Sequence, residues 1–256
     1  MMNRVVVKVG THVLSEHNRL YKPRILNLIA FIVDLMEHHE VILVSSGAVA
    51  AGYSFLKIDK NNLNNRQAIA AIGQPQLIAK YNKNLEKFGK IGAQLLLTAG
   101  DFDSRKRSHY AKCTIETLIK NNILPIINEN DATATEELVF GDNDQLSARV
   151  AHYFDAQMLI LLSDIDGYYD SDPNKNPNAV MKKVVREIEE SELAVNTDAT
   201  YQFATGGILT KLKAADYLLK RNRKMFIASG FDLGDIKSYM LDHIHQGGTL
   251  FSNEEE

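Results

Sequence analysis

The sequence contains a single cysteine, and this scarcity limits what the protein can be. Cys113 is the only cysteine among the 256 residues, so no intramolecular disulfide can form. This fits a reducing compartment. No stretch approaches the roughly 18 uninterrupted apolar residues of a membrane helix. Charges interrupt the first apolar run, "MMNRVVVKVG", so we expect no signal peptide. We therefore predict a cytoplasmic protein that has no contact with a membrane.

Positive charge is not in excess either. The formal net charge is -3, which does not fit the strongly basic balance of many nucleic-acid-binding proteins, so we expect no nucleic-acid partner. The composition, 45% hydrophobic and 24% charged, is ordinary for a globular protein with one sizeable core.

Several familiar motifs are also missing. The chain has no G-x-S-x-G, no pair of CxxC motifs and no G-x-G-x-x-G, and its histidines form no catalytic pattern. The stretch "ATGGILTKLKAADYLL", residues 204–219, combines two glycines with Thr210 and Lys211 before an apolar helical pattern. It fails the P-loop pattern G-x-x-x-x-G-K-[ST], because threonine precedes the lysine and leucine follows it. The stretch is either a different phosphate site or an ordinary loop entering a helix.

What the sequence does contain is a regular alternation of two apolar patterns. Short, continuous β-branched runs are typical of strands buried on both faces, and longer segments with helical spacing separate them. This alternation predicts an α/β fold with a largely parallel sheet, in which ligands bind beyond the carboxyl ends of the strands. The predicted strands are residues 4–10, 40–47, 93–98, 122–130, 157–164 and 224–229. The predicted helices are residues 25–38, 66–88, 110–120, 143–152 and 209–220.

Polar residues at the end of the first predicted strand are ambiguous. Lys8 stands between Val7 and Val9, so it either extends to water at a sheet edge or faces an anion; taken alone, the first interpretation is favoured. Gly10 and Thr11 follow and permit a tight turn whose N–H groups suit an anion.

Three further strand ends carry candidate residues. After the second strand, "SSGAVAAG" opens a small-residue helix, which is either an N-cap with close packing or an anion site. "NENDATAT" crowds amide and carboxylate groups that form a polar turn or suit an ammonium group. In "GDNDQLSA", a capping box of Asp142 and Gln145 would leave Asn143 and Asp144 unexplained.

The last two motifs are equally open. Ser163 and Asp164 end an apolar run, before either a hairpin-like turn or a nucleotide site. Gly206 and Gly207 lead into a helix whose first turn would hold Thr210 and Lys211, which suits phosphate; the alternative is a flexible loop capped at Thr205.

The order of these motifs is more informative than any one of them. The succession "VVVKVGT", "VSSGAVAAG", "LPIINENDA", "GDNDQLSA", "LLSDIDGYYDSDPNKNP" and "TGGILTKLKAA" resembles the amino acid kinase family over residues 4 to about 252. Within it, "INENDA" and "GDNDQLSA" are similar to the glutamate kinases. The resemblance implies a three-layer αβα sandwich and ATP-dependent phosphorylation of the γ-carboxylate of L-glutamate, the first step of proline biosynthesis. The alternative is another small-molecule kinase of this fold, acting on uridylate or aspartate.

The resemblance also implies an organisation and a set of partners. We expect one domain over residues 1–256, with the substrate side in residues 1–150 and the nucleotide side in residues 151–256, and without the C-terminal PUA domain of many relatives. ATP and Mg²⁺ are the implied cofactors, with Mg²⁺ held mainly by the ATP phosphates. Proline as a feedback inhibitor, a dimer or tetramer, and transient contact with glutamate 5-phosphate reductase are family expectations.

Residue roles follow from the same resemblance. Lys8 and Lys211 would contact the transferring phosphoryl group, and Asp144 would organise both lysines. The residues implied to hold glutamate are Ser46, Asn128, Asp131 and Asn143. The residues implied to hold ATP are Lys8, Gly10, Thr11, Ser163, Asp164, Thr205, Gly206, Gly207, Ile208, Leu209, Thr210 and Lys211.

Overall fold

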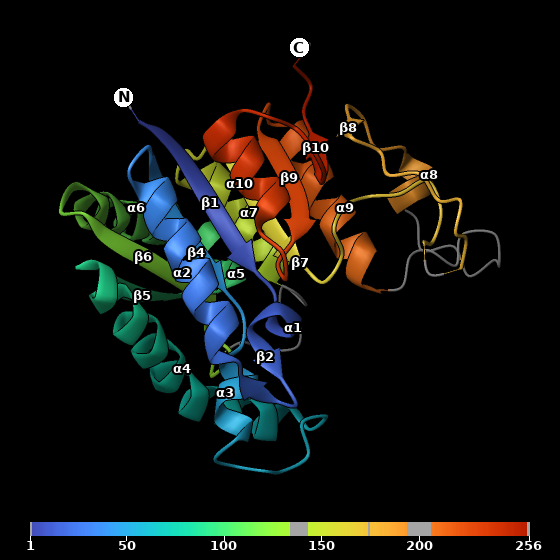
Figure 1. Cartoon of the computed structure of the whole chain (residues 1–256). Coiled ribbons are helices and arrows are strands. Elements are labelled where there is room, and N and C mark those ends of the chain that lie inside the picture. Colours follow the sequence, from blue (N-terminus) through green and yellow to red (C-terminus); the bar gives the residue numbers. More distant parts are fainter. Residues whose placement is uncertain (1, 134–142, 174, 194–205, 255–256) are drawn as a thin grey trace.

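A central sheet of eight strands organises the computed structural model of the chain (Figure 1). The structure describes residues 2–133, 143–173, 175–193 and 206–254. Every pair of neighbouring strands is parallel except β9 with β10, so the predicted largely parallel sheet is confirmed. In spatial order the strands are β5 (Ile91–Leu97), β6 (Ile123–Glu129), β4 (His39–Ser45), β1 (Asn3–Val9), β7 (Met158–Ser163), β9 (Lys224–Ser229), β10 (Thr249–Phe251) and β8 (Val184–Val185).

Helices cover both faces of this sheet, which gives the predicted three layers (Figure 1). One face packs against α2 (Lys22–Met36), α4 (Leu63–Leu85) and α10 (Gly234–Lys237). The other packs against α5 (Ala99–Phe102), α6 (Arg105–Lys120), α7 (Asn143–Tyr153) and α9 (Gly206–Leu219). Shorter elements are α1 (Thr11–Leu14), β2 (Ser15–Glu16), β3 (Arg19–Leu20), α3 (Ala48–Tyr53), η1 (Glu86–Phe88), α8 (Glu190–Leu193) and η3 (Ser238–Asp242).

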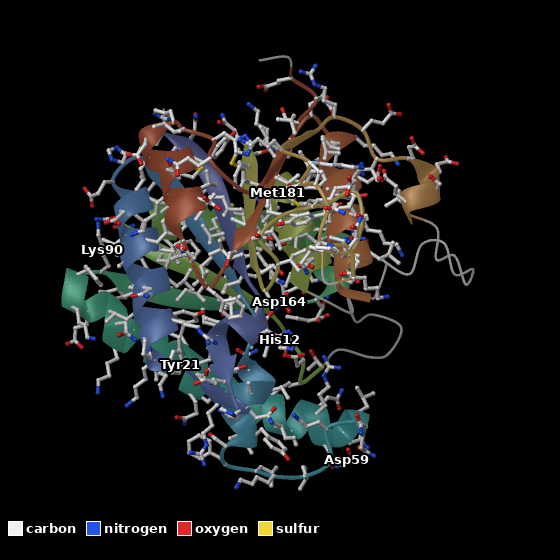
Figure 2. The ribbon with its side chains drawn as sticks, turned by 45° about the vertical axis from the view of Figure 1, so that its right-hand side comes forward. His12, Tyr21, Asp59, Lys90, Asp164 and Met181 are labelled. Atoms are coloured by element: carbon white, nitrogen blue, oxygen red, sulfur yellow. The ribbon has the colours of Figure 1, made fainter. Side chains whose placement is uncertain are left out.

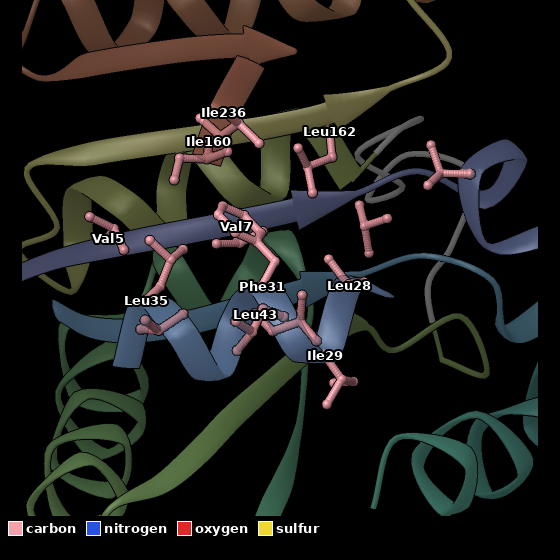
Figure 3. Close-up of a cluster of buried hydrophobic side chains, with 14 of the residues drawn as sticks. Val5, Val7, Leu28, Ile29, Phe31, Leu35, Leu43, Ile160, Leu162 and Ile236 are labelled. Atoms are coloured by element: carbon pink, nitrogen blue, oxygen red, sulfur yellow. The ribbon is translucent and has the colours of Figure 1, made fainter. Parts of the chain in front are cut away.

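The alternation of side chains along β1 decides which face its lysine meets. Val5 and Val7 pack into the core on the α2 side, where Figure 3 shows them beside Phe31 and Leu35. Val6 packs into the opposite core, and because strand side chains alternate, Lys8 shares that face. Since β1 is the fourth of eight strands, the interpretation of Lys8 as an edge residue is wrong.

The predicted elements are present, with shifted ends and some omissions. All six predicted strands and all five predicted helices occur, but α6 begins five residues before its predicted start and α9 is already helical at Gly206. Strands β8 and β10 and the small β2–β3 hairpin were not predicted, because runs of two or three residues show no periodicity. None of the helices in the described part of the chain has the length and apolar character needed to cross a bilayer.

Two glycines allow α3 and α4 to pack closely beside the end of β4. A side chain at Gly73 would overlap the carbonyl oxygen of Ala48, and one at Gly52 would overlap the carbonyl oxygen of Ile69. The two backbones are therefore in contact, and α3, which begins immediately after β4, is held in one position.

We expect Gly73→Ala to lower the free energy of unfolding by about 2 kcal/mol or more, because the added methyl group forces two backbones apart. Urea denaturation measures this change. Gly100→Ala in α5 is the matched control: its added methyl group lies 3.5 Å from the nearest atom, the side-chain Nη2 of Arg107, and no loss is expected. Equal effects of the two substitutions would contradict the close-packing account.

Candidate active site

Two lysines from distant parts of the chain share one carboxylate beneath the carboxyl ends of the strands. The Nζ atom of Lys8 forms an ion pair with Oδ1 of Asp144, and Nζ of Lys211 lies 3.1 Å from Oδ2. All three residues are buried, with 3%, 0% and 6% of their surfaces exposed for Lys8, Asp144 and Lys211 respectively. We call these three residues the lysine–aspartate cluster.

The fold brings the cluster together from three elements. Lys8 is the penultimate residue of β1, Asp144 stands in the first turn of α7, and Lys211 extends from α9. The sequence predicted that Lys211 lies in the first turn of this helix. Because α9 is already helical at Gly206, Lys211 lies in the second turn instead. Its Nζ donates to the carbonyl oxygen of Gly207 at 3.1 Å, and the Thr210 hydroxyl lies 3.1 Å from Oδ2 of Asp144.

The electrostatics of the cluster favour an anion beside it. Burying a charge is costly unless it is paired, and the shared carboxylate pairs both ammonium groups. The three side chains together nevertheless carry one more positive than negative charge. A phosphate group approaching the two ammonium groups would find charge complementarity and donors already in position.

A first cavity of about 320 Å³ opens on one side of the cluster. The amide nitrogen of Asn143 points into its wall, where it lies 2.9 Å from the Ser46 hydroxyl and 2.8 Å from Oδ1 of Asn128. The cavity thus presents fixed amide, hydroxyl and carboxylate groups. Its lining residues are Thr11, Ser46, Gly47, Ala48, Val49, Lys60, Arg66, Asn128, Glu129, Asp131 and Asn143.

Burial disturbs the ionisation of Asp131, one of the carboxylates of this cavity. Desolvation raises its pKa above the ordinary value, and the positive charge of Arg66 opposes the shift only in part. A carboxylate held at this cost is suited to a cationic ligand group, whose arrival would lower the pKa again.

A second cavity of about 320 Å³ opens on the other side. Asp164 stands at its mouth beside His12, as Figure 2 shows, with Oδ2 3.1 Å from the imidazole Nδ1. Desolvation acts to raise the pKa of Asp164, but hydrogen bonds from Ser163 and His12 hold it below its usual value. Its lining residues are Asp164, Ile165, Asp166, Gly167, Tyr169, Asp172, Pro173, Gly207, Ile208 and Lys211.

Some of the predicted site residues line these two cavities. All four residues predicted to hold glutamate line the first cavity. Of those predicted to hold ATP, the second cavity is lined by Asp164, Gly207, Ile208 and Lys211.

The other predicted nucleotide residues lie in different places. Thr11 lines the first cavity, and Gly10 packs against Lys8, since a side chain there would lie 3.7 Å from its Nζ. Leu209 is a buried apolar side chain, and Thr205 lies outside the described residues.

Two residues of the first cavity were not predicted from the sequence. Arg66 comes from the start of α4 and Lys60 from the loop before it, far along the chain from the motifs they face. No local pattern marks them, because their role depends on how α4 packs. Glu129 belongs to the motif "NENDATAT", and the structure shows that it is buried at the wall of the first cavity.

Comparison with known proteins defines the class. The sequence profile of the amino acid kinase family matches residues 3–229. A UMP kinase from Ureaplasma parvum superimposes with a TM-score of 0.67 at 15% identity, covering 98% of this chain and 99% of that one. A carbamate kinase from Giardia lamblia bound to AMP-PNP superimposes with a TM-score of 0.66 at 15% identity, covering 99% of each. The chain belongs to the amino acid kinase family.

Sequence relatives narrow the class further. The chain is 54% identical over 255 residues to a glutamate 5-kinase of Wolinella succinogenes, covering 98% of each. It is 51% identical over 250 residues to a glutamate 5-kinase of Leishmania donovani, covering 98% of this chain and 95% of the relative. Within its family the chain therefore belongs with the glutamate 5-kinases.

The raised pKa of Asp131 predicts a stability change with a defined sign. The carboxyl group of Asp131 holds its proton more tightly in the folded protein than in the unfolded chain. The free energy of unfolding therefore rises as pH falls through the folded pKa, and it is lower above that pKa. We expect Asp131→Asn to raise the Tm of the ligand-free protein at pH 7, with a gain that vanishes as pH falls toward the unfolded value of 3.8.

Thermal unfolding from pH 4 to pH 8 measures this difference. Asp103→Asn, which alters an exposed carboxylate, serves as the control and should leave the Tm nearly unchanged. A lower Tm for Asp131→Asn at pH 7 would show that Asp131 is stabilised as a carboxylate, contrary to this account.

Proposed function

We propose that the protein transfers the γ-phosphoryl group of ATP to the γ-carboxylate of L-glutamate and forms L-glutamyl 5-phosphate, the first step of proline biosynthesis. The observation that carries this proposal is the buried lysine–aspartate cluster, whose Lys211 lines the second cavity and whose Asp144 follows Asn143 of the first, with all four predicted glutamate residues around the first cavity. The glutamate 5-kinase relatives, at up to 54% identity over nearly the whole chain, support the same acceptor.

The chemistry needs charge neutralisation more than proton transfer. The γ-carboxylate of glutamate has a pKa of about 4.3 and is already ionised at neutral pH, so the nucleophile needs no general base. Its obstacle is repulsion from an anionic phosphoryl group whose transition state spreads charge over the equatorial oxygens. Lys8 and Lys211 would face that charge, and Asp144 would hold both flexible side chains in place, which otherwise costs up to about 2 kcal/mol each.

The first cavity suits an amino acid with a free ammonium group. Asp131, with the amide oxygen of Asn143, would accept hydrogen bonds from that group. The amide oxygen of Asn128 already accepts from the Asn143 amide and from the N–H of Glu129, so Asn128 would orient Asn143 beside the substrate. The Ser46 hydroxyl and the N–H groups at the start of α3 would meet the α-carboxylate. An acetylated nitrogen would gain little from Asp131, which favours free glutamate over acetylglutamate.

The second cavity suits the nucleotide. Gly207 faces open space at the start of α9, where backbone N–H groups can approach phosphates, and Lys211 reaches from there to the cluster. Mg²⁺ bound to the ATP phosphates would add positive charge at the transferring group. Among the described residues, no group of three histidine, cysteine or acidic side chains is placed to hold a metal ion.

The division into two sides fits the same picture. Every residue lining the first cavity falls within residues 1–150, and every residue lining the second within residues 151–256. We therefore assign the substrate side and the nucleotide side of one domain to these two parts. A cytoplasmic location, a dimer or tetramer, proline inhibition and contact with glutamate 5-phosphate reductase stay predictions.

Trapping the acyl phosphate as a hydroxamate tests the reaction and the acceptor together. The purified protein is incubated with ATP, Mg²⁺ and hydroxylamine, and with glutamate, aspartate or acetylglutamate in parallel. We expect hydroxamate from glutamate at least about tenfold faster than from the other two acids. ADP release with UMP is measured beside them, and a preference for UMP or aspartate would overturn the proposal in favour of a sister activity.

We expect Lys211→Ala to lower kcat by about 100-fold or more, because one of two ammonium groups facing the transition-state charge is lost. The KM for glutamate should change little, since the lysine lies beyond the first cavity. Lys213→Ala is the matched control, because Lys213 is exposed on the same helix and should leave kcat unchanged. Nearly intact turnover in Lys211→Ala would remove Lys211 from the reaction.

A further inference from the structure

The side chain of Tyr81, a fully buried residue of α4, reaches the end of β4, the strand that leads into the first cavity. The hydroxyl of Tyr81 lies 2.8 Å from Oγ of Ser45, the last residue of β4, and both residues have 0% of their surface exposed. Ser45 immediately precedes Ser46, whose side chain lines the cavity. A tyrosine ring fills space without its hydroxyl, so this polar end needs an account of its own.

The direction of these hydrogen bonds is fixed by counting protons. The Ser45 hydroxyl has one proton and donates it to the carbonyl oxygen of Ser46 at 2.8 Å. The Tyr81 hydroxyl must therefore donate to Ser45 Oγ. Burial raises the pKa of Tyr81 well above its usual range, so the phenol keeps the proton that this chain of bonds requires.

The chain of bonds ends on the carbonyl oxygen of Ser46, a residue that is also held through its N–H group and its hydroxyl. The N–H of Ser46 donates to the carbonyl oxygen of Val9, and its hydroxyl accepts from the Asn143 amide at 2.9 Å. The same amide lies 3.2 Å from the carbonyl oxygen of Ser45. Immediately afterwards Gly47 takes a φ of +106° and α3 begins. The peptides on both sides of Ser46 are therefore held, and their orientation decides where its hydroxyl points.

We infer that Tyr81 is a positioning residue for the acceptor substrate, acting through Ser45 to orient Ser46 toward the α-carboxylate of bound glutamate. This inference rests on the proposed function, because it names what sets the geometry of the glutamate side of that site. Tyr81 itself is not in the wall of the cavity. Its effect passes through two hydrogen bonds to a residue that is.

Tyr81→Phe removes only the hydroxyl and tests this role. We expect the KM for glutamate to rise about five- to tenfold, the effect of losing one hydrogen bond, while kcat and the KM for ATP stay within about twofold. Tyr168→Phe is the matched control: it removes another buried tyrosine hydroxyl, which donates to Glu192 at 2.5 Å, and should leave the glutamate KM unchanged.

Ser45→Ala interrupts the same chain from its other side and should raise the glutamate KM to a similar extent. The double variant should be no worse than either single one, because both remove one linkage. If Tyr81→Phe does not fold, Ser45→Ala carries the test alone. An unchanged glutamate KM in the folded single variants, with only a lower Tm, would show a merely structural hydroxyl and overturn the inference. The proposed function fails separately, if the wild-type protein does not phosphorylate glutamate at all.

Discussion

The ion pairs of Asp144 with Lys8 and Lys211 are the interaction on which the arrangement of the site depends. A carboxylate with no exposed surface is tolerable in a protein interior only with cationic partners, and the two lysines are equally costly to bury without it. Loss of the carboxylate would leave two ammonium groups facing each other in a region of low dielectric. The need to pair these buried charges therefore holds β1, α7 and α9 in one relative position. Local packing alone does not impose this requirement.

The start of α7 connects these ion pairs to both cavities. Asn143 and Asp144 are consecutive residues there, yet the first lines the first cavity and the second binds the lysine that lines the second cavity. A helix turns by about 100° per residue, so neighbouring side chains in one turn can serve two sides. The two substrates would then meet at a place fixed by a single helical turn, which is what phosphoryl transfer between two anions requires.

Much of this was predictable from the sequence, because continuous apolar runs and helical spacing are local properties. The sequence predicted strands β1, β4, β6 and β7, and the structure contains all four. Because ligands bind beyond the carboxyl ends of parallel strands, the polar residues at these ends were expected to lie at one edge of the sheet. Lys8 was misjudged when taken alone, because no local pattern distinguishes a central strand from an edge. Arg66 and Tyr81 carried no local signal, because only the packing of α4 brings Arg66 to the first cavity and Tyr81 to Ser45.

Helix α4 shows why such residues follow from the whole fold. Its close approach to α3 is set by two glycines, and from that position Gln74 donates to the carbonyl oxygen of Glu129 while Tyr81 meets Ser45. The ends of β6 and β4 are therefore braced by one helix on the face opposite the lysine–aspartate cluster. Charges such as Asp131 are held in the cavity at a cost to stability, and a cavity that must keep them in place needs rigid walls behind it. Helix α4 thus supplies rigidity to the walls of the cavity that holds these charges.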